Sequence, residues 1–566
     1  MIFNITLMKI TNFATRLFTL FLLVVLSTSC QYESQKADLV LTNATIWTGN
    51  EKSPIAESMA ISGDTIISIG NSQEVSEFIG EKTNVVDAKG KFVTPGFIDT
   101  HVHLLTGGFN LNSVQLRNAK TPEEFIKRIK EFAKTVPKGS WILGGDWDHE
   151  NWGGKLPTKD WIDEATKDNP VFITRLDGHM SLANSVALKL AGVSNNVKDI
   201  AGGEIVRSKK GELTGLLKDN ATNLILPFIT EPTEDEYKKA LNAAMKYLAS
   251  NGVTSVHHMS AASHYNILKK VNANNNLITR IYAMYPLSRW KNLKKEIDTN
   301  GSGDKWLKIG GLKGFVDGSL GSHTAAFFDP YVDNPSDKGF FVMPMNTIYN
   351  YVKDADNENL QVMIHAIGDK AINNLLNTFE TVQKENGNKD RRFRIEHAQH
   401  IAENDFKRFS QLNVIPSMQP YHAIDDGRWA EKLIGSERIK TTYAFKSLLD
   451  AKANLVFGSD WFVAPPIPLM GIYAAVTRRT LDDKNLEGWV PEQKISVTQA
   501  LRAYTKNAAF SSFEEKIKGT LEPGKLADFV IINGDLTKVD PNTIKDLKIL
   551  ETYVGGKKVF DIGSNK

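Results

Sequence analysis

The sequence predicts an α/β fold: a distorted (β/α)8 TIM-like barrel with an insertion, plus a small β-sandwich formed by the N- and C-terminal segments. Three observations support this prediction. Apolar strand-like segments alternate with amphipathic helix-like segments over residues 94–512, which is typical of a parallel sheet. The alternation repeats often enough for a closed barrel. Short β-like segments, separated by glycines and polar pairs, occupy both ends of the 566-residue chain.

The β-like end regions cover residues 31–93 and 513–566. Asp38–Trp47 and Thr65–Gly70 are strand-like near the start, and Ile549–Phe560 is strand-like near the end. Because chain termini often lie close together in space, we expect the two regions to form one β-sandwich.

The barrel region, residues 94–512, is much longer than the roughly 250 residues of a plain barrel. We expect the excess to be an insertion at about residues 146–230, a stretch rich in glycine, tryptophan and charged residues. The helix-like segments include Glu123–Lys134, Glu234–Ser250, Lys370–Glu385 and Ser496–Lys506. The strand-like segments are Trp141–Gly144, Val171–Thr174, Val253–His257, Leu360–His365, Phe393–His397, Val414–Ser417 and Leu455–Gly458.

Composition and charge exclude some classes of function. With 41% hydrophobic and 23% charged residues, the chain is typical of globular proteins. Its formal net charge of +3 is small for this length and no basic run stands out, so we predict no nucleic-acid partner. The single cysteine, Cys30, excludes intramolecular disulfides and thiolate metal sites. Any bound metal must therefore have nitrogen and oxygen ligands.

The first 30 residues are typical of an export signal. Lys9 and Arg16 precede the apolar run Leu17–Leu26, which is too short for the roughly 20 residues that span a bilayer. Small polar residues and Cys30 follow, an order that resembles the lipobox of bacterial lipoproteins. This resemblance implies a lipidated Cys30 and a membrane-anchored protein of the bacterial cell envelope, at its periplasmic or outer-membrane face. An ordinary secretory signal with an incidental cysteine is the alternative.

Two histidines spaced two positions apart close the segment Phe92–His103. Because side chains alternate along a strand, His101 and His103 point the same way, into the barrel mouth. Two imidazoles at the carboxyl end of a barrel strand form half of a metal site, where barrel chemistry takes place. A chance pair of loop histidines is the alternative, which the preceding Pro-Gly-Phe-Ile-Asp context disfavours.

Three further strand ends carry suitable metal ligands: His365, His397 and Asp460. Each alone is more often a core or capping residue than a ligand. Their recurrence at separate strand ends, in barrel order, favours a common site because the strands of a barrel converge at its mouth.

Several motifs in this chain form a recognisable set. They are Thr94–His103, Asp177–Asn184, Asp317–Ala325, His365–Ala371, Arg394–His397, Phe457–Asp460 and the closing Gly519–Phe529. Together they resemble the amidohydrolase superfamily, specifically the amidohydrolase-3 branch that contains N-substituted formamide deformylases. The resemblance covers about Ala37 to Phe560. It is highly specific for the fold and the metal site and says little about the substrate.

The resemblance implies a role for each predicted ligand. His101 and His103 would bind one metal ion, and His365 and His397 would bind a second. Asp460 would contact a metal ion, accept the proton of the attacking water and pass it to the leaving nitrogen.

Many relatives also carry a carboxylated lysine that bridges the two ions. Lys313 is the best-placed candidate for this N6-carboxylated residue, and Lys308 is the competitor, since spacing alone does not choose between them. Without carboxylation the site would hold only one tightly bound ion. Zn²⁺ suits the ligand set, and Mn²⁺, Fe²⁺ or Co²⁺ remain alternatives.

The implied activity is hydrolysis of an amide-type carbon–nitrogen bond, other than a peptide bond, in a small molecule such as an N-substituted formamide. N-acyl amino acids, N-acetyl sugars and cyclic amides are alternative substrates of the same machinery. A non-catalytic, solute-binding envelope lipoprotein is an alternative of a different class, disfavoured because a binder needs no water-activating carboxylate. The sequence leaves the oligomeric state open, a homodimer included.

Three residues outside the ligand set are expected to line the substrate pocket: His179, His323 and Trp147. For both histidines the alternative is a structural hydrogen bond within a loop. For Trp147 it is the insertion's own small core. His257 and His258 are expected to pack inside the barrel.

Overall fold

The computed structural model describes residues 35–259 and 262–565, and its centre is an eight-stranded parallel sheet. This sheet is the predicted barrel. Its first and last strands meet through a bridge between Val102 and Trp461, so the barrel is nearly closed. In chain order the strands are β8 (Phe97–Val102), β15 (Val253–His258), β16 (Arg280–Pro286), β17 (Leu307–Phe315), β18 (Gln361–Ala366), β19 (Arg394–His397), β20 (Ile415–Met418) and β21 (Val456–Phe457).

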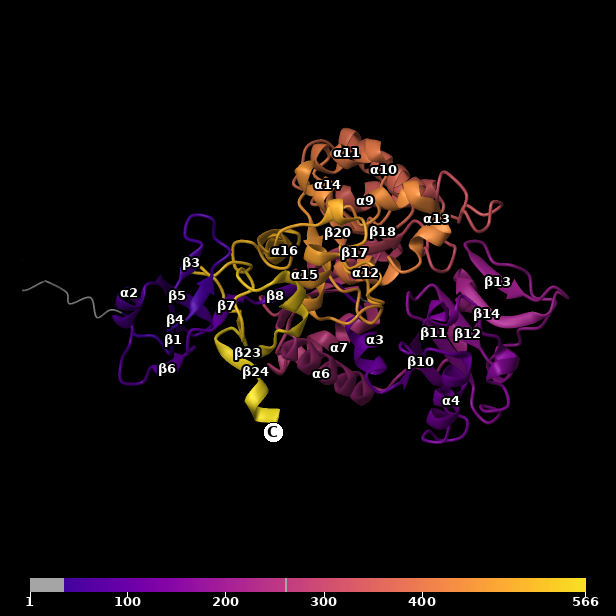
Figure 1. Cartoon of the computed structure of the whole chain (residues 1–566), viewed down its shortest axis with the longest axis horizontal. Helices are drawn as coiled ribbons and strands as arrows, with labels where there is room; N and C mark the ends of the chain where they lie inside the picture. The colour runs from indigo at the N-terminus through magenta and orange to yellow at the C-terminus, as the bar shows by residue number, and fades with distance from the viewer. Residues whose placement is uncertain (1–34, 260–261, 566) are drawn as a thin grey trace, which may run out of the picture.

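Amphipathic helices accompany the barrel strands (Figure 1). In α6, a capping box between Thr233 and Glu236 starts the helix, and Leu241, Met245 and Leu248 form its buried face. The longer helices are α6 (Glu234–Ser250), α7 (Ala262–Ala273), α8 (Trp290–Asn300), α9 (Met345–Asn357), α10 (Asp369–Asn386) and α15 (Pro468–Thr477). The shorter ones are α3 (Leu104–Asn110), α11 (Phe406–Gln411), α12 (Pro420–Asp426), α13 (Ala430–Arg438), α14 (Phe445–Asp450), α16 (Val497–Ala503) and α17 (Lys506–Phe510).

The two chain ends share one six-stranded sheet, which confirms the predicted joint β domain. Strand β7 (Phe92–Pro95) pairs with β2 (Thr45–Trp47) on one side and antiparallel with β22 (Phe529–Ile532) on the other. The remaining strands are β3 (Ile55–Ala56), β23 (Ile549–Val554) and β24 (Lys557–Asp561) in this sheet, and β1 (Leu39–Thr42), β4 (Ser58–Ser62), β5 (Thr65–Gly70) and β6 (Asn84–Asp87) in a four-stranded sheet beside α2 (Ser72–Ser76).

The insertion forms its own six-stranded sheet, set to one side of the barrel in Figure 1. It begins at Val114, so the expected start near residue 146 is too late, and β10 belongs to this sheet, not to the barrel as expected. The parallel pairing of β9, β10 and β11 produces the alternation of a barrel, so periodicity does not separate the two. The elements are β9 (Val114–Gln115), α4 (Pro122–Ala133), β10 (Ile142–Trp147), β11 (Val171–Arg175), β12 (Met180–Ala183), α5 (Ser185–Leu190), β13 (Gly203–Arg207) and β14 (Leu213–Asp219).

The predicted signal segment, residues 1–30, and its Cys30 lie outside the described residues. Within the described part of the chain, no helix combines the length and apolar character needed to cross a membrane.

Candidate metal centre

Three predicted ligands converge at the barrel mouth. His101 lies near the end of β8, His103 is the N-cap of α3, and Asp460 follows β21. The Oδ1 atom of Asp460 lies 3.4 Å from Nε2 of His101 and 3.2 Å from Nε2 of His103. Although buried, this oxygen has no hydrogen-bond partner among the described residues. Two imidazole nitrogens and a carboxylate oxygen in this arrangement fit a divalent metal ion.

The two other predicted histidines lie beside this group. His365 is next to the last residue of β18 and His397 is the last residue of β19, with ring centroids 4.4 Å apart. Nδ1 of His397 donates to Oε1 of Gln419 at 2.9 Å, which leaves Nε2 free for a metal ion. Nε2 of His365 donates to the carbonyl oxygen of Gly318 at 3.0 Å, which leaves Nδ1 free. Each ring thus has one nitrogen held by the protein and one available to a ligand.

The structure distinguishes the two candidate lysines. Lys313 lies towards the carboxyl end of β17, and its Nζ is 3.3 Å from Nε2 of His101. Lys308 lies near the start of the same strand and donates to the carbonyl oxygen of Ser512. Burial lowers the pKa of Lys313 to about 8, which increases the fraction of neutral amine, the form that reacts with CO₂. Lys313 is therefore the lysine that reaches the site.

The histidines are in the protonation state that binds metals. Burial, with the nearby charge of Lys313, lowers the pKa of His101 to about 4. Burial also lowers the pKa values of His365 and His397 well below the ordinary value. At neutral pH these imidazoles are uncharged, as metal coordination requires.

The buried carboxylate of Glu396 contacts the ring nitrogen of His101 that points away from the barrel mouth. Oε2 of Glu396 lies 2.6 Å from Nδ1 of His101, and Oε1 of Glu396 lies 2.8 Å from Nε of Arg394. Burial alone would raise the pKa of Glu396, but Arg394 and His101 outweigh it and hold the value at about 2. The ionised Glu396 accepts a hydrogen bond from Nδ1–H of His101, so that the unprotonated Nε2 faces the mouth as a ligand.

Two of the candidate ligands have strained backbones. His397 has a φ of +72° and Asp460 a φ of +60°, in the left-handed region that residues other than glycine rarely adopt. Such conformations cost on the order of 1–3 kcal/mol and tend to cluster at functional sites. Their presence at His397 and Asp460 agrees with a functional role for both positions.

A cavity of about 40 Å³ adjoins the candidate ligands, lined in part by His365, His397 and Asp460. The insertion contributes His179 to the cavity lining, and its Nδ1 lies 2.6 Å from Oδ1 of Asp219. The ring of His179 is 5.0 Å from that of His365. One wall of the cavity therefore comes from the insertion.

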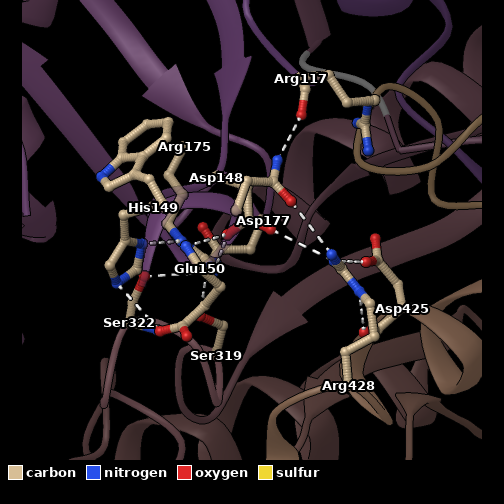
Figure 2. A network of polar contacts seen from close by, with 12 residues as sticks. Arg117, Asp148, His149, Glu150, Arg175, Asp177, Ser319, Ser322, Asp425 and Arg428 are labelled. Carbon is tan, nitrogen blue, oxygen red and sulfur yellow. Dashed lines mark hydrogen bonds and ion pairs between the residues drawn. The ribbon is translucent and has the colours of Figure 1, made fainter. Parts of the chain in front are cut away.

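Ion pairs join this wall to the barrel (Figure 2). The buried Arg175 of the insertion donates to Asp148 at 3.0 Å and to Asp177 at 2.6 Å. From the barrel side, Arg428 binds Asp425 and reaches Asp148 at 3.5 Å. The network fixes the insertion against the end of helix α12, which follows β20.

The predictions for the two other pocket residues are wrong. His323 is not among the residues that line the cavity; it stacks on Tyr331 and pairs with Asp333 and Asp337. Trp147 is fully buried in the insertion's core, where its Nε1 donates to the carbonyl oxygen of Ile173. Both residues have the structural role given as the alternative.

Sequence reasoning missed one histidine of the site. His422, in α12, lines the cavity, and a ligand atom of its ring lies within 4.8 Å of those of His397 and Asp460. The segment Gln419-Pro-Tyr-His422 directly follows β20, so its place after a barrel strand was the available signal. Glu396, next to His397 in the sequence, was missed as a supporting residue.

Comparisons with known proteins agree with this geometry. A family model described as the amidohydrolase family matches residues 84–560. Protein LONG AFTER FAR-RED 3 of Arabidopsis thaliana is 43% identical over 539 residues, covering 93% of this chain and 92% of that protein. N-substituted formamide deformylase of Arthrobacter pascens is 26% identical over 547 residues, covering 92% of this chain and 98% of that enzyme. The crystal structure of an uncharacterized metal-dependent hydrolase of Pyrococcus horikoshii is 30% identical, with a TM-score of 0.72, and the match covers 89% of this chain and 99% of that one.

The support of His101 by Glu396 generates the first prediction. The substitution Glu396→Gln should weaken metal binding by about 10–100-fold, because the neutral amide lacks the negative charge that makes His101 a more basic metal ligand. Competition with a chromophoric chelator measures this affinity. Glu514→Gln is the matched control, since Glu514 is a buried acid paired with Lys518 at the opposite end of the barrel strands. Unchanged metal affinity in folded Glu396→Gln protein would show that the contact is not needed.

Proposed function

We propose, on the premise that this chain belongs to the amidohydrolase family, that it hydrolyses the carbon–nitrogen bond of small N-substituted formamides or related amides. As a member of that family the protein is a metal-dependent hydrolase. The observation that carries the proposal is the convergence of His101 and His103 on the unpartnered Oδ1 of Asp460. A carboxylate beside two metal-binding imidazoles suits a site that activates water.

The chemistry divides between the ion and the protein. A divalent ion such as Zn²⁺, when bound, polarises the substrate carbonyl and lowers the pKa of water from about 15.7 towards about 7. Burial alone would raise the pKa of Asp460, but His101 and His103 hold it below its usual range, so the side chain is an ionised base. Asp460 accepts a proton as the water oxygen bonds to the carbonyl carbon. It then returns the proton to the nitrogen as the carbon–nitrogen bond breaks, releasing an acid and an amine.

One comparison supports a small acyl group. A relative that is 26% identical and aligns with 92% of this chain is an N-substituted formamide deformylase. N-acyl amino acids, N-acetyl sugars and cyclic amides are the alternatives within the same chemistry. A non-catalytic binding protein would have no use for the proton-accepting Asp460.

Metal dependence is the second prediction. Protein purified without chelator should carry at least about one equivalent of transition metal and release amine from an N-formyl amide. The double substitution His101→Ala/His103→Ala should abolish both properties and leave the protein folded, because the buried Glu396 keeps its ion pair with Arg394. Elemental analysis and an amine assay over N-formyl, N-acetyl and cyclic amides measure them. His323→Ala is the matched control, and full activity of metal-free protein would contradict the mechanism.

The third prediction concerns the proposed carboxylation of Lys313. A carboxylated Lys313 would add oxygen ligands between the two ions, so Lys313→Ala should lose the second ion and most of the activity. Bicarbonate should assist reconstitution of the wild-type protein, as measured by metal stoichiometry and recovery of turnover. Lys308→Ala, at the other end of β17, should retain both ions. Full metal content and rate in Lys313→Ala would exclude the bridging role.

Attachment to a membrane is the fourth prediction. A lipidated Cys30 would carry a diacylglyceryl group and an N-acyl chain, and multiple chains anchor a protein stably, whereas one chain does not. The polar segment Gln31–Ala37 would then keep the enzyme near the bilayer surface. In detergent partitioning of the native host, wild-type protein should enter the detergent phase and Cys30→Ser should not. A wild-type protein that is cleaved, unlipidated and wholly in the aqueous phase would indicate a plain secreted hydrolase.

A further inference from the structure

Two residues that line the cavity each carry a buried atom without a hydrogen-bond partner among the described residues. One atom is Oδ1 of Asp460, which belongs to the ligand set already described, and the other is Nε2 of His422. His422 is only 9% exposed, so bulk water does not compensate for the missing partner. Leaving a buried polar atom unsatisfied is unfavourable, which indicates that Nε2 has a partner in the working enzyme.

The fold holds His422 in place. Its helix, α12, directly follows β20 and packs against α15. At the end of α12, Asp426 accepts hydrogen bonds from Tyr443 and Gln399. Beyond it, Arg428 binds Asp425 and contacts Asp148 of the insertion, as Figure 2 shows. Contacts with both the barrel and the insertion therefore hold the imidazole at the cavity.

The position of His422 identifies its partner. Ligand atoms of His397, His422 and Asp460 all lie within 4.8 Å of one another. Two ligand atoms that each lie about 2.0–2.2 Å from one shared Zn²⁺ are less than 4.8 Å apart. Modest side-chain movements would therefore bring all three residues into coordination. Nε2 of His397 is also available, because its Nδ1 is held by Gln419. Zn²⁺ and similar divalent ions bind well to this combination of two imidazole nitrogens and one carboxylate oxygen.

We propose that His422 binds the second divalent metal ion through Nε2, together with His397, and that Asp460 faces both ions. His422 thereby extends the ligand set beyond the strand-end residues His101, His103, His365 and His397. The inference rests on the metal dependence in the proposed function. It differs from the alternative in which His422 hydrogen-bonds the substrate, because it requires metal binding to change when no substrate is present.

The fifth prediction follows from this assignment. His422→Asn should leave the first ion bound and lower the affinity for the second by at least about 10-fold. Co²⁺ titration, read by visible absorption and by competition with a chelator, measures both sites without any assay of activity. The spectrum of the second equivalent should also change, because an imidazole nitrogen is lost from its coordination shell.

His400→Asn is the matched control. His400 is buried, its Nε2 likewise lacks a partner among the described residues, and it does not line the cavity beside the ligands. This variant should bind both equivalents as the wild type does. Wild-type affinities and spectrum in folded His422→Asn would overturn the assignment and leave His422 a role toward substrate.

The unaltered protein provides a second test that does not depend on the folding of a variant. Anomalous diffraction from crystals of the wild type loaded with two equivalents of Zn²⁺ locates both ions. The second peak should lie about 2.0–2.2 Å from Nε2 of His422 and from Nε2 of His397. A second peak away from His422 would overturn the proposal. A wild type that binds only one ion would overturn it too and leave the hydrolase function standing, whereas a wild type that binds no metal would defeat the proposed function itself.

Discussion

The hydrogen bond between Glu396 and His101 is the contact on which the candidate site depends. Both side chains are fully buried, and Arg394 is buried beside them. Glu396 also forms a buried ion pair with Arg394, and removing one member of such a pair generally costs about 3–5 kcal/mol because the other charge is left uncompensated. The contact also determines which nitrogen of His101 faces the mouth. A single interaction thus couples the stability of the barrel interior to the geometry of the first ligand.

The barrel and the insertion together form the candidate site. The barrel strands supply the candidate ligands from their carboxyl ends, while the insertion supplies a wall that contains His179. The ion pairs of Arg175 and Arg428 join the two parts and lie close to α12. Because α12 carries His422, the same contacts that close the cavity also place a metal-binding imidazole. Metal binding and substrate enclosure are therefore connected in this fold.

Much of the site was predictable because the side-chain period of a strand and the convergence of barrel strands are strict geometric rules. From these rules the sequence predicted one shared site for His101, His103, His365, His397 and Asp460. The choice between Lys313 and Lys308 required the limits of β17, which spacing does not supply. His422 lies in a helix after its strand, so the strand-end rule did not select it. For His323 and Trp147, residue type alone did not distinguish a position in the cavity wall from a position in the packed interior. Only their packing in the structure shows which position each one has.

The central claim is that His101, His103 and Asp460 bind a metal ion at the barrel mouth. X-ray diffraction from zinc-loaded crystals, with anomalous data collected at the zinc absorption edge, tests it most directly. The account predicts an anomalous peak about 2.0–2.2 Å from Nε2 of His101, Nε2 of His103 and a carboxylate oxygen of Asp460. A fully loaded, active protein whose zinc peak lies away from these three residues would contradict it.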